Sequence, residues 1–185
     1  SNVLTVCALT VKDTAIREAV VKTAMRSLDS FIGGYHEDGG CDEGPHYWGV
    51  AGGALFNACL VLYDMTDGYV DIFRDPLIVN MCEYIAKVNV SGDYYLTFSD
   101  SHAKRRSTSR FGYDWAVLSG SQMAQDFWST REFDETTLNS VAEYNTIYRH
   151  MRQLGISQAS SATYQAPMKV WLDGLCVAVT RENRD

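Results

Sequence analysis

The chain lacks the signatures of several protein classes. No apolar run approaches the roughly 20 residues of a membrane span, and no charged, apolar and small-residue leader opens it. The 5 cysteines contain no Cys-x-x-Cys pair, and the 4 histidines contain no His-x-x-x-His pair. The sequence therefore predicts no membrane partner, no metal site and no cofactor. Free, mostly buried thiols are favoured over disulfides.

Basic residues are also scarce relative to acidic ones. Among 185 residues, 16 Lys and Arg stand against 23 Asp and Glu, for a formal charge of −7. This acidic field repels phosphate, so a nucleic acid is not an expected partner. With 46% hydrophobic and 21% charged residues, the composition is that of a globular protein.

Apolar residues at helical spacing predict three helices in the first half of the chain. The ranges are 13–32, 46–65 and 76–88. Asp13 is a good N-cap for the first helix, and Pro45 suits the start of the second. The first helix carries a continuous apolar stripe, which consists of Ile16, Val20, Ala24, Leu28 and Ile32.

The second half predicts two further helices and two extended regions. Residues 89–100 alternate like a strand, while 113–128 and 134–151 have helical patterns. Asp173-Gly174 lies between two apolar runs within 170–179, which is typical of a β-hairpin. We therefore expect a mostly α fold of antiparallel helix pairs with a short C-terminal β-hairpin.

The densest group of chemically useful side chains lies at residues 38–48. The three carboxylates of Asp38, Asp42 and Glu43 precede His46 and Tyr47 within ten residues, at a turn that leads into a helix. The free N–H groups of a helix N-terminus can hold an anion. Acidic residues before a helix are also ordinary caps, so composition alone leaves both interpretations open.

The order of these residues resembles a known family. The run from Asp38 to Trp48 reads DGGCDEGPHYW, which closely resembles a motif of the heparinase II/III-like polysaccharide lyases. Residues 1–29 are similar to the helix pair that precedes this motif in the family. Residues 94–100 resemble a later aromatic segment, from which Thr97 and Ser99 depart. The end of the chain, from 170 to 183, is similar to the opening of the family's β-sandwich.

This resemblance implies a partial (α/α) toroid over residues 1–166 and the start of a β-sandwich domain over 167–185. The implied partner is an acidic polysaccharide, and the implied reaction is β-elimination at a uronic acid. Tyr47 occupies the family's catalytic tyrosine position, so we expect it to act as general acid and also as base. No cofactor is expected.

Five further residues are expected to contact substrate. Glu43 and Trp48 match the family motif, and His46 occupies a variable position within it. His102 and Arg105 lie in or beside a basic loop that can hold an anionic sugar.

One departure from the family limits the activity expected of this chain. In the family, a second catalytic residue, an Asn or His, lies farther before the tyrosine than this sequence extends before Tyr47. A further His of the family belongs to the β-domain. Neither residue is therefore expected in this chain. We therefore expect an inactive piece of a lyase, whose incompletely covered apolar faces favour a homo-oligomer. The parent protein can be cytoplasmic, periplasmic or secreted.

Two other functions remain open from the sequence. A toroid glycoside hydrolase would use two carboxylates, such as Asp38 and Glu43. A carbohydrate-binding or scaffold module would catalyse nothing. Only elimination leaves a conjugated double bond in its product, whereas a hydrolase gives a product without one and a binding module gives no product. Product analysis therefore distinguishes the three functions.

Overall fold

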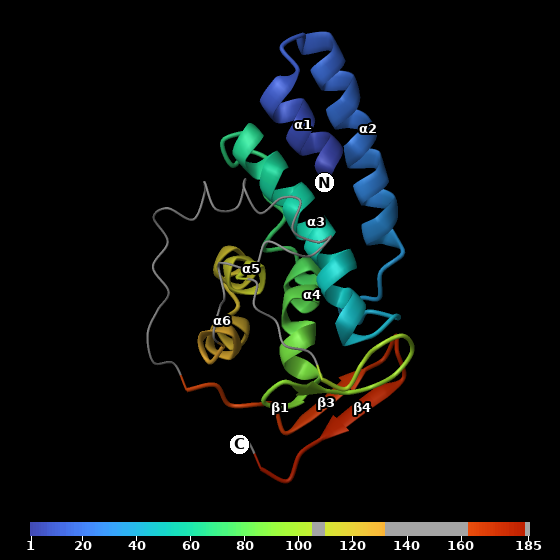
Figure 1. The fold of residues 1–185 in the computed structure, drawn as a ribbon, viewed down its shortest axis with the longest axis vertical. Coiled ribbons are helices and arrows are strands. Elements are labelled where there is room, and N and C mark those ends of the chain that lie inside the picture. The colour runs from blue at the N-terminus through green and yellow to red at the C-terminus, as the bar shows by residue number, and fades with distance from the viewer. Residues whose placement is uncertain (105–109, 132–162, 184–185) are drawn as a thin grey trace.

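The computed structural model of the protein describes residues 1–104, 110–131 and 163–183. Figure 1 shows a helical body with a β-hairpin beneath it. The described part is mostly α with a short C-terminal hairpin, as expected from the sequence. The predicted helix 134–151 and Arg105 lie outside the described residues.

The N-terminal helices α1 (Asn2–Thr10) and α2 (Thr14–Gly33) pack side by side at one end of the molecule (Figure 1). The Asp13 carboxylate caps α2 by accepting a hydrogen bond from the Ile16 N–H at 3.0 Å. The helix thus forms where predicted. However, none of its side chains is fully buried, and Ile16 is 56% exposed. The apolar stripe is therefore only half covered.

Helix α3 (Pro45–Met65) is the central helix of the body. Its glycine at position 52 permits close packing, because a Cβ there would lie 3.3 Å from the Trp48 indole nitrogen and 3.4 Å from the Trp115 ring. Within the described residues, α3 alone is long and apolar enough to cross a membrane. Because 61% of that apolar window is buried inside the protein, α3 has the character of a core helix.

Helix α4 (Pro76–Lys87) contacts α3 and two shorter helices, α5 (Phe111–Ser119) and α6 (Gln122–Ser129). Asp75 caps α4 by accepting from the Leu77 N–H at 2.9 Å. Three indoles meet in the core that these helices enclose. The Trp48 ring stacks 5.9 Å from Trp115 and 6.2 Å from Trp128.

Two predicted elements differ from the structure. The single helix predicted over 113–128 is two helices, because Gly120 adopts a left-handed conformation (φ 74°) that ends α5. Ser121 then caps α6 through the Ala124 N–H. The extended region 89–100 contains only the short pair β1 (Asn89–Ser91) and β2 (Tyr94–Tyr95), followed by irregular chain.

The C-terminal hairpin is confirmed. Strands β3 (Lys169–Leu172) and β4 (Val177–Thr180) pair antiparallel, so the turn spans 173–176 rather than Asp173-Gly174 alone. Leu172 and Val179 are buried. The Arg181 guanidinium donates to the carbonyls of Lys87 and Asn89, which ties the hairpin to the end of α4.

Candidate functional site

The loop before α3 is held in place by two glycines with left-handed backbone conformations. Gly39 has φ 76° and Gly44 has φ 84°. A Cβ on Gly39 would overlap the backbone of Asn80 on α4, and one on Gly44 would overlap the Ser101 hydroxyl. The loop is therefore wedged between α4 and the segment that follows β2.

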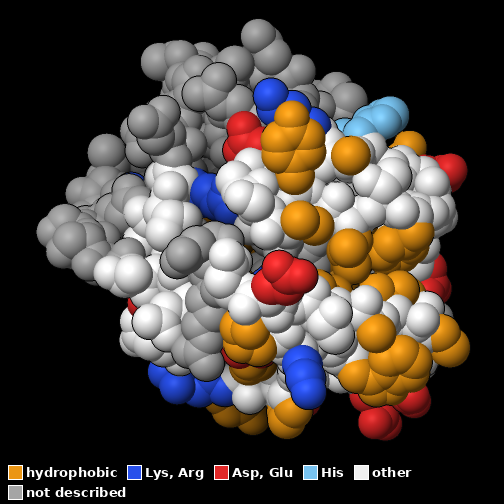
Figure 2. All heavy atoms as spheres, turned by 90° about the horizontal axis from the view of Figure 1, so that it is seen from below, with side chains coloured by type: hydrophobic (Ala, Val, Ile, Leu, Met, Phe, Trp, Pro, Cys, Tyr) orange, Lys and Arg blue, Asp and Glu red, His pale blue; other side chains and the backbone are white. Residues whose placement is uncertain are grey.

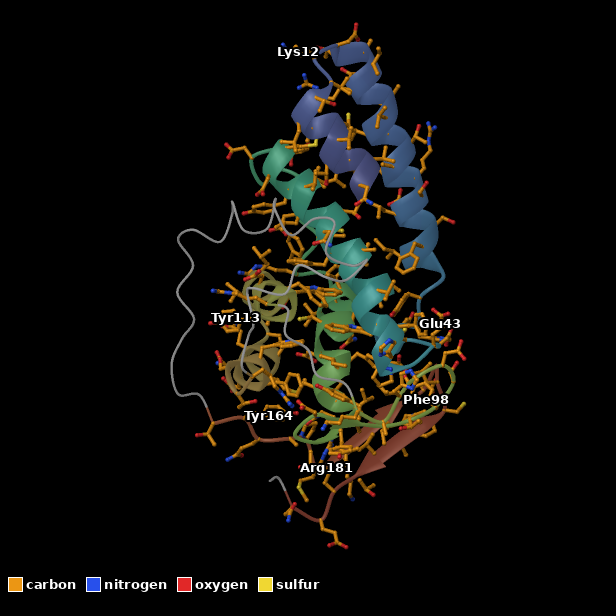
Figure 3. All side chains as sticks on the ribbon, in the orientation of Figure 1. Lys12, Glu43, Phe98, Tyr113, Tyr164 and Arg181 are labelled. Atoms are coloured by element: carbon orange, nitrogen blue, oxygen red, sulfur yellow. The ribbon has the colours of Figure 1, made fainter. Side chains whose placement is uncertain are left out.

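Ser101 joins that segment to the start of α3. Its hydroxyl accepts a hydrogen bond from the His46 N–H at 2.8 Å and donates to the Glu43 carbonyl at 3.4 Å. Figure 3 shows Glu43 and Phe98, which come from these two parts of the chain, at the same end of the molecule. The serine therefore uses one of the N–H groups that the sequence had suggested for an anion.

Three aromatic rings with ionisable groups meet at this helix end. The His46 ring centroid lies 5.5 Å from that of Tyr47 and 5.3 Å from that of His102, both in edge-on geometry. Both histidines are exposed, whereas Tyr47 is half-buried against the core. The fold thus unites the candidates His46, Tyr47 and His102, although His102 is distant in sequence.

The carboxylates of the loop have different roles. Asp38 accepts N–H groups with both oxygens, from Gly40 at 2.8 Å and from Gly174 at 2.9 Å. It therefore attaches the hairpin turn to the loop. Asp42 forms an exposed pair with His36 at 2.8 Å, whereas the Glu43 side chain is exposed and its backbone carbonyl accepts a hydrogen bond from Ser101.

Trp48 is not available as a substrate contact, which corrects the expectation from the family motif. Its side chain is 0% exposed, and its indole N–H donates to the Met81 carbonyl at 2.7 Å. The apolar residues of α4, α5 and α6 surround it because the helix turns this position inward. Trp48 is a core residue that positions the start of α3.

Burial disfavours the thiolate form of three cysteines in the core. Four of the five free cysteines are buried, and Cys176 is exposed. Burial raises the pKa of Cys59 to about 12 and raises the pKa of the Cys41 and Cys82 thiols. Burial likewise raises the pKa of the Tyr35 and Tyr84 phenols beneath the loop.

No group of three or more His, Cys, Asp or Glu side chains that could hold a metal occurs among the described residues. Ser101 is the site residue that sequence reasoning missed. Nothing near it in sequence marks it, because its partners lie more than 50 positions away.

A scan against models of protein families finds no match to this chain, and a search of curated proteins finds no relative.

Proposed function

We propose that this chain is the toroid portion, with the start of the β-domain, of a polysaccharide lyase that cleaves uronic-acid-containing polysaccharide by β-elimination. The observation that carries the proposal is the meeting of Tyr47, His46 and His102 at one helix end. The resemblance of residues 38–48 to the heparinase II/III-like motif supports the same reaction class.

The proposed reaction needs two proton transfers and charge neutralisation. A base removes the proton from C5 of the uronate, the C4–O bond breaks, and its electrons leave with the glycosidic oxygen while C4 and C5 become doubly bonded. A phenol is normally protonated at neutral pH, so Tyr47 would give its proton to the departing oxygen. The ring N–H groups of His46 and His102 would donate hydrogen bonds to the sugar carboxylate and so offset its charge.

The carboxylate pair required for a hydrolase is less well supported. Both oxygens of Asp38 accept backbone N–H groups, one of them from the hairpin turn. Donating a proton to a glycosidic oxygen would require Asp38 to give up one of these contacts. Asp38 is therefore better suited to hold the loop than to act as a general acid with Glu43.

The test measures the ultraviolet absorbance of the conjugated product. The full-length protein that contains this chain is incubated with heparan, chondroitin, hyaluronan and alginate. Tyr47→Phe keeps the ring and removes the hydroxyl, so we expect the absorbance to disappear. Tyr69→Phe is the matched control, because Tyr69 is 91% exposed and contributes nothing to the cluster.

The possible outcomes separate the candidate functions. Absorbance that survives Tyr47→Phe would remove the role proposed for this residue. Reducing ends released without absorbance would identify a hydrolase. Binding without any product would favour a carbohydrate-binding module.

A further inference from the structure

Two histidines from distant parts of the chain meet at the start of α3. His46 lies in the first turn of α3, and His102 directly follows Ser101 in the segment after β2. Their ring centroids lie 5.3 Å apart, with the ring planes at 77°. Both residues are exposed, and Figure 2, which views this end of the molecule from below, shows histidine atoms at the surface. A small solute can therefore reach both rings.

The separation of the two rings fits a metal ion shared between them. A zinc-bound imidazole nitrogen lies about 2.0–2.1 Å from the ion, so the ring centroid lies about 3.2 Å from it. Two imidazoles at a tetrahedral angle then have centroids about 5 Å apart, close to the 5.3 Å observed. The χ2 torsion of histidine has a broad range, so two exposed rings can turn a nitrogen toward the same ion.

The backbones that carry the two rings are joined by a hydrogen bond. The Ser101 hydroxyl accepts from the His46 N–H at 2.8 Å, and Ser101 is the residue before His102. Gly44 lets the two segments approach each other, because a Cβ there would overlap the Ser101 hydroxyl. A pair of ligands that the fold already holds together loses less conformational entropy when an ion binds.

Two imidazoles select a particular class of cation. Imidazole nitrogens suit zinc, nickel and copper, whereas magnesium and calcium prefer oxygen ligands. Within the described residues, no third His, Cys, Asp or Glu completes a group that could hold a metal. The remaining coordination positions would therefore be filled by water or by a bound solute. The formal charge of −7 also attracts cations to the protein.

We propose that His46 and His102 together bind a divalent transition-metal ion such as Zn²⁺, through one ring nitrogen each. The ion links the start of α3 to the segment that follows β2, and it therefore stabilises the folded chain. The site depends on the geometry of the two rings and does not require the elimination reaction. One consequence does rest on the proposed function: Zn²⁺ should inhibit elimination, because the ion and the sugar carboxylate compete for the same rings.

The test is a calorimetric titration of Zn²⁺ into the chelator-treated full-length protein, with Mg²⁺ as the comparison. We expect Zn²⁺ to bind more tightly than Mg²⁺. His46→Gln and His102→Gln each remove one imidazole from an exposed position, so each should weaken Zn²⁺ binding at least about tenfold. His36→Gln and Cys176→Ala are the matched controls, because they remove an imidazole paired with Asp42 and an exposed thiol. Both controls should keep the wild-type affinity.

Thermal melting gives a second readout that is independent of activity. Zn²⁺ should raise the melting temperature of the wild type and of His36→Gln, and should raise it less in His46→Gln and His102→Gln. Ser101→Ala keeps both imidazoles but removes the hydroxyl that joins their backbones. We expect this variant to bind Zn²⁺ more weakly than the wild type and more tightly than either histidine variant. Melting without Zn²⁺ checks that each variant is folded.

The proposal is overturned if the wild type binds no Zn²⁺, or if both histidine variants bind it as tightly as the wild type. It is also overturned if Mg²⁺ binds as tightly as Zn²⁺. Wild-type affinity in Ser101→Ala would remove the role given to the hydrogen bond. Failure of the elimination assay with retained histidine-dependent Zn²⁺ binding would reject the lyase reaction and leave the metal site, and elimination without Zn²⁺ binding would do the reverse.

Discussion

At the scale of single residues, burial divides the reactive side chains into two groups. His46 and His102 are exposed and Tyr47 is half-buried, so solvent and a ligand can reach this cluster. Trp48, the next residue in sequence, is wholly buried. Cys59 and Cys82 are buried as well, and desolvation of the thiolate raises the pKa of both thiols. Of the candidate site residues in the described part of the chain, those that a ligand can reach therefore include the rings at the surface of the α3 start.

The buried Cys59 thiol should make stability depend on pH. Its pKa is raised from 9.0 to about 12 in the folded protein, so the unfolded chain loses this proton first as the pH rises. The contribution of the protonated Cys59 thiol to the free energy of unfolding is complete below pH 9 and is lost progressively toward pH 12. Above pH 9, the unfolding free energy should fall more steeply in the wild type than in Cys59→Ala, by about 1.4 kcal/mol per pH unit.

Urea unfolding from neutral pH to about pH 11 measures this difference. Cys176→Ala is the matched control, because this cysteine is exposed and the pH dependence should stay that of the wild type. Parallel curves for the wild type and Cys59→Ala would show that the thiol is solvated in the folded protein.

At the scale of elements, loops and caps decide where helices meet. The loop before α3 reaches α4 only because Gly39 has no side chain, and the Asn80 side chain holds it there by donating to the Glu37 carbonyl at 2.9 Å. The hairpin is attached in a similar way, through Asp38 at its turn and Arg181 after its second strand. Single backbone contacts therefore set the relative positions of whole elements.

Gly39→Ala should be much more damaging than Gly92→Ala. Both glycines have positive φ angles, 76° and 51°, so each alanine costs about 1–2 kcal/mol of backbone strain. A Cβ at position 92 meets nothing within 4 Å, whereas one at 39 overlaps the Asn80 backbone. We expect several additional kcal/mol for Gly39→Ala, measured as a larger loss of melting temperature. Equal losses would mean that the loop does not approach α4 so closely.

Arg181→Ala should loosen the hairpin. The guanidinium donates to the carbonyls of Pro167, Lys87 and Asn89, and its removal leaves half-buried acceptors without these donors. We expect a loss of about 1–3 kcal/mol in urea unfolding. Arg181→Lys should recover only part of it, because one ammonium cannot reach all three carbonyls. Arg26→Ala, at an exposed position of α2, is the control and should have little effect.

At the scale of the whole molecule, the two ends of the helical body differ in burial. Helix α4 contributes six fully buried side chains to the core, and α2 contributes none. An apolar cavity of about 490 Å³ lies between α1, α2 and α3, with Leu4, Val20 and Leu28 in its lining. The α2 end therefore has less packing energy to hold it in place.

Hydrogen exchange should reveal this difference. Because local opening costs less where few apolar contacts are lost, the central amides of α2 should exchange faster than those of α4. Exchange followed by mass spectrometry on the full chain measures both helices at once. Equal protection would instead indicate that the stripe on α2 is covered in solution, and light scattering would then test for the expected homo-oligomer.

The sequence predicted elements better than it predicted how they combine. Asp13 and Pro45 identified two helix starts, and in the structure Asp13 accepts the capping hydrogen bond of α2 while Pro45 begins α3. Gly120 ends α5, and Ser121 caps the start of α6. These two residues are a local signal for a break, which the apolar pattern of 113–128 obscured. His46 and His102 were each singled out from the sequence, and their rings meet in the structure, a contact that the sequence did not predict.

Local chemistry determined the helices, their caps, the hairpin and the concentration of acidic and aromatic residues before α3, because these depend on neighbours within a few positions. Only the tertiary structure decided that Trp48 is a core residue and that Ser101 joins the two site loops. These outcomes depend on contacts between residues tens of positions apart. Such contacts exist only after the apolar faces have packed, so no local pattern encodes them.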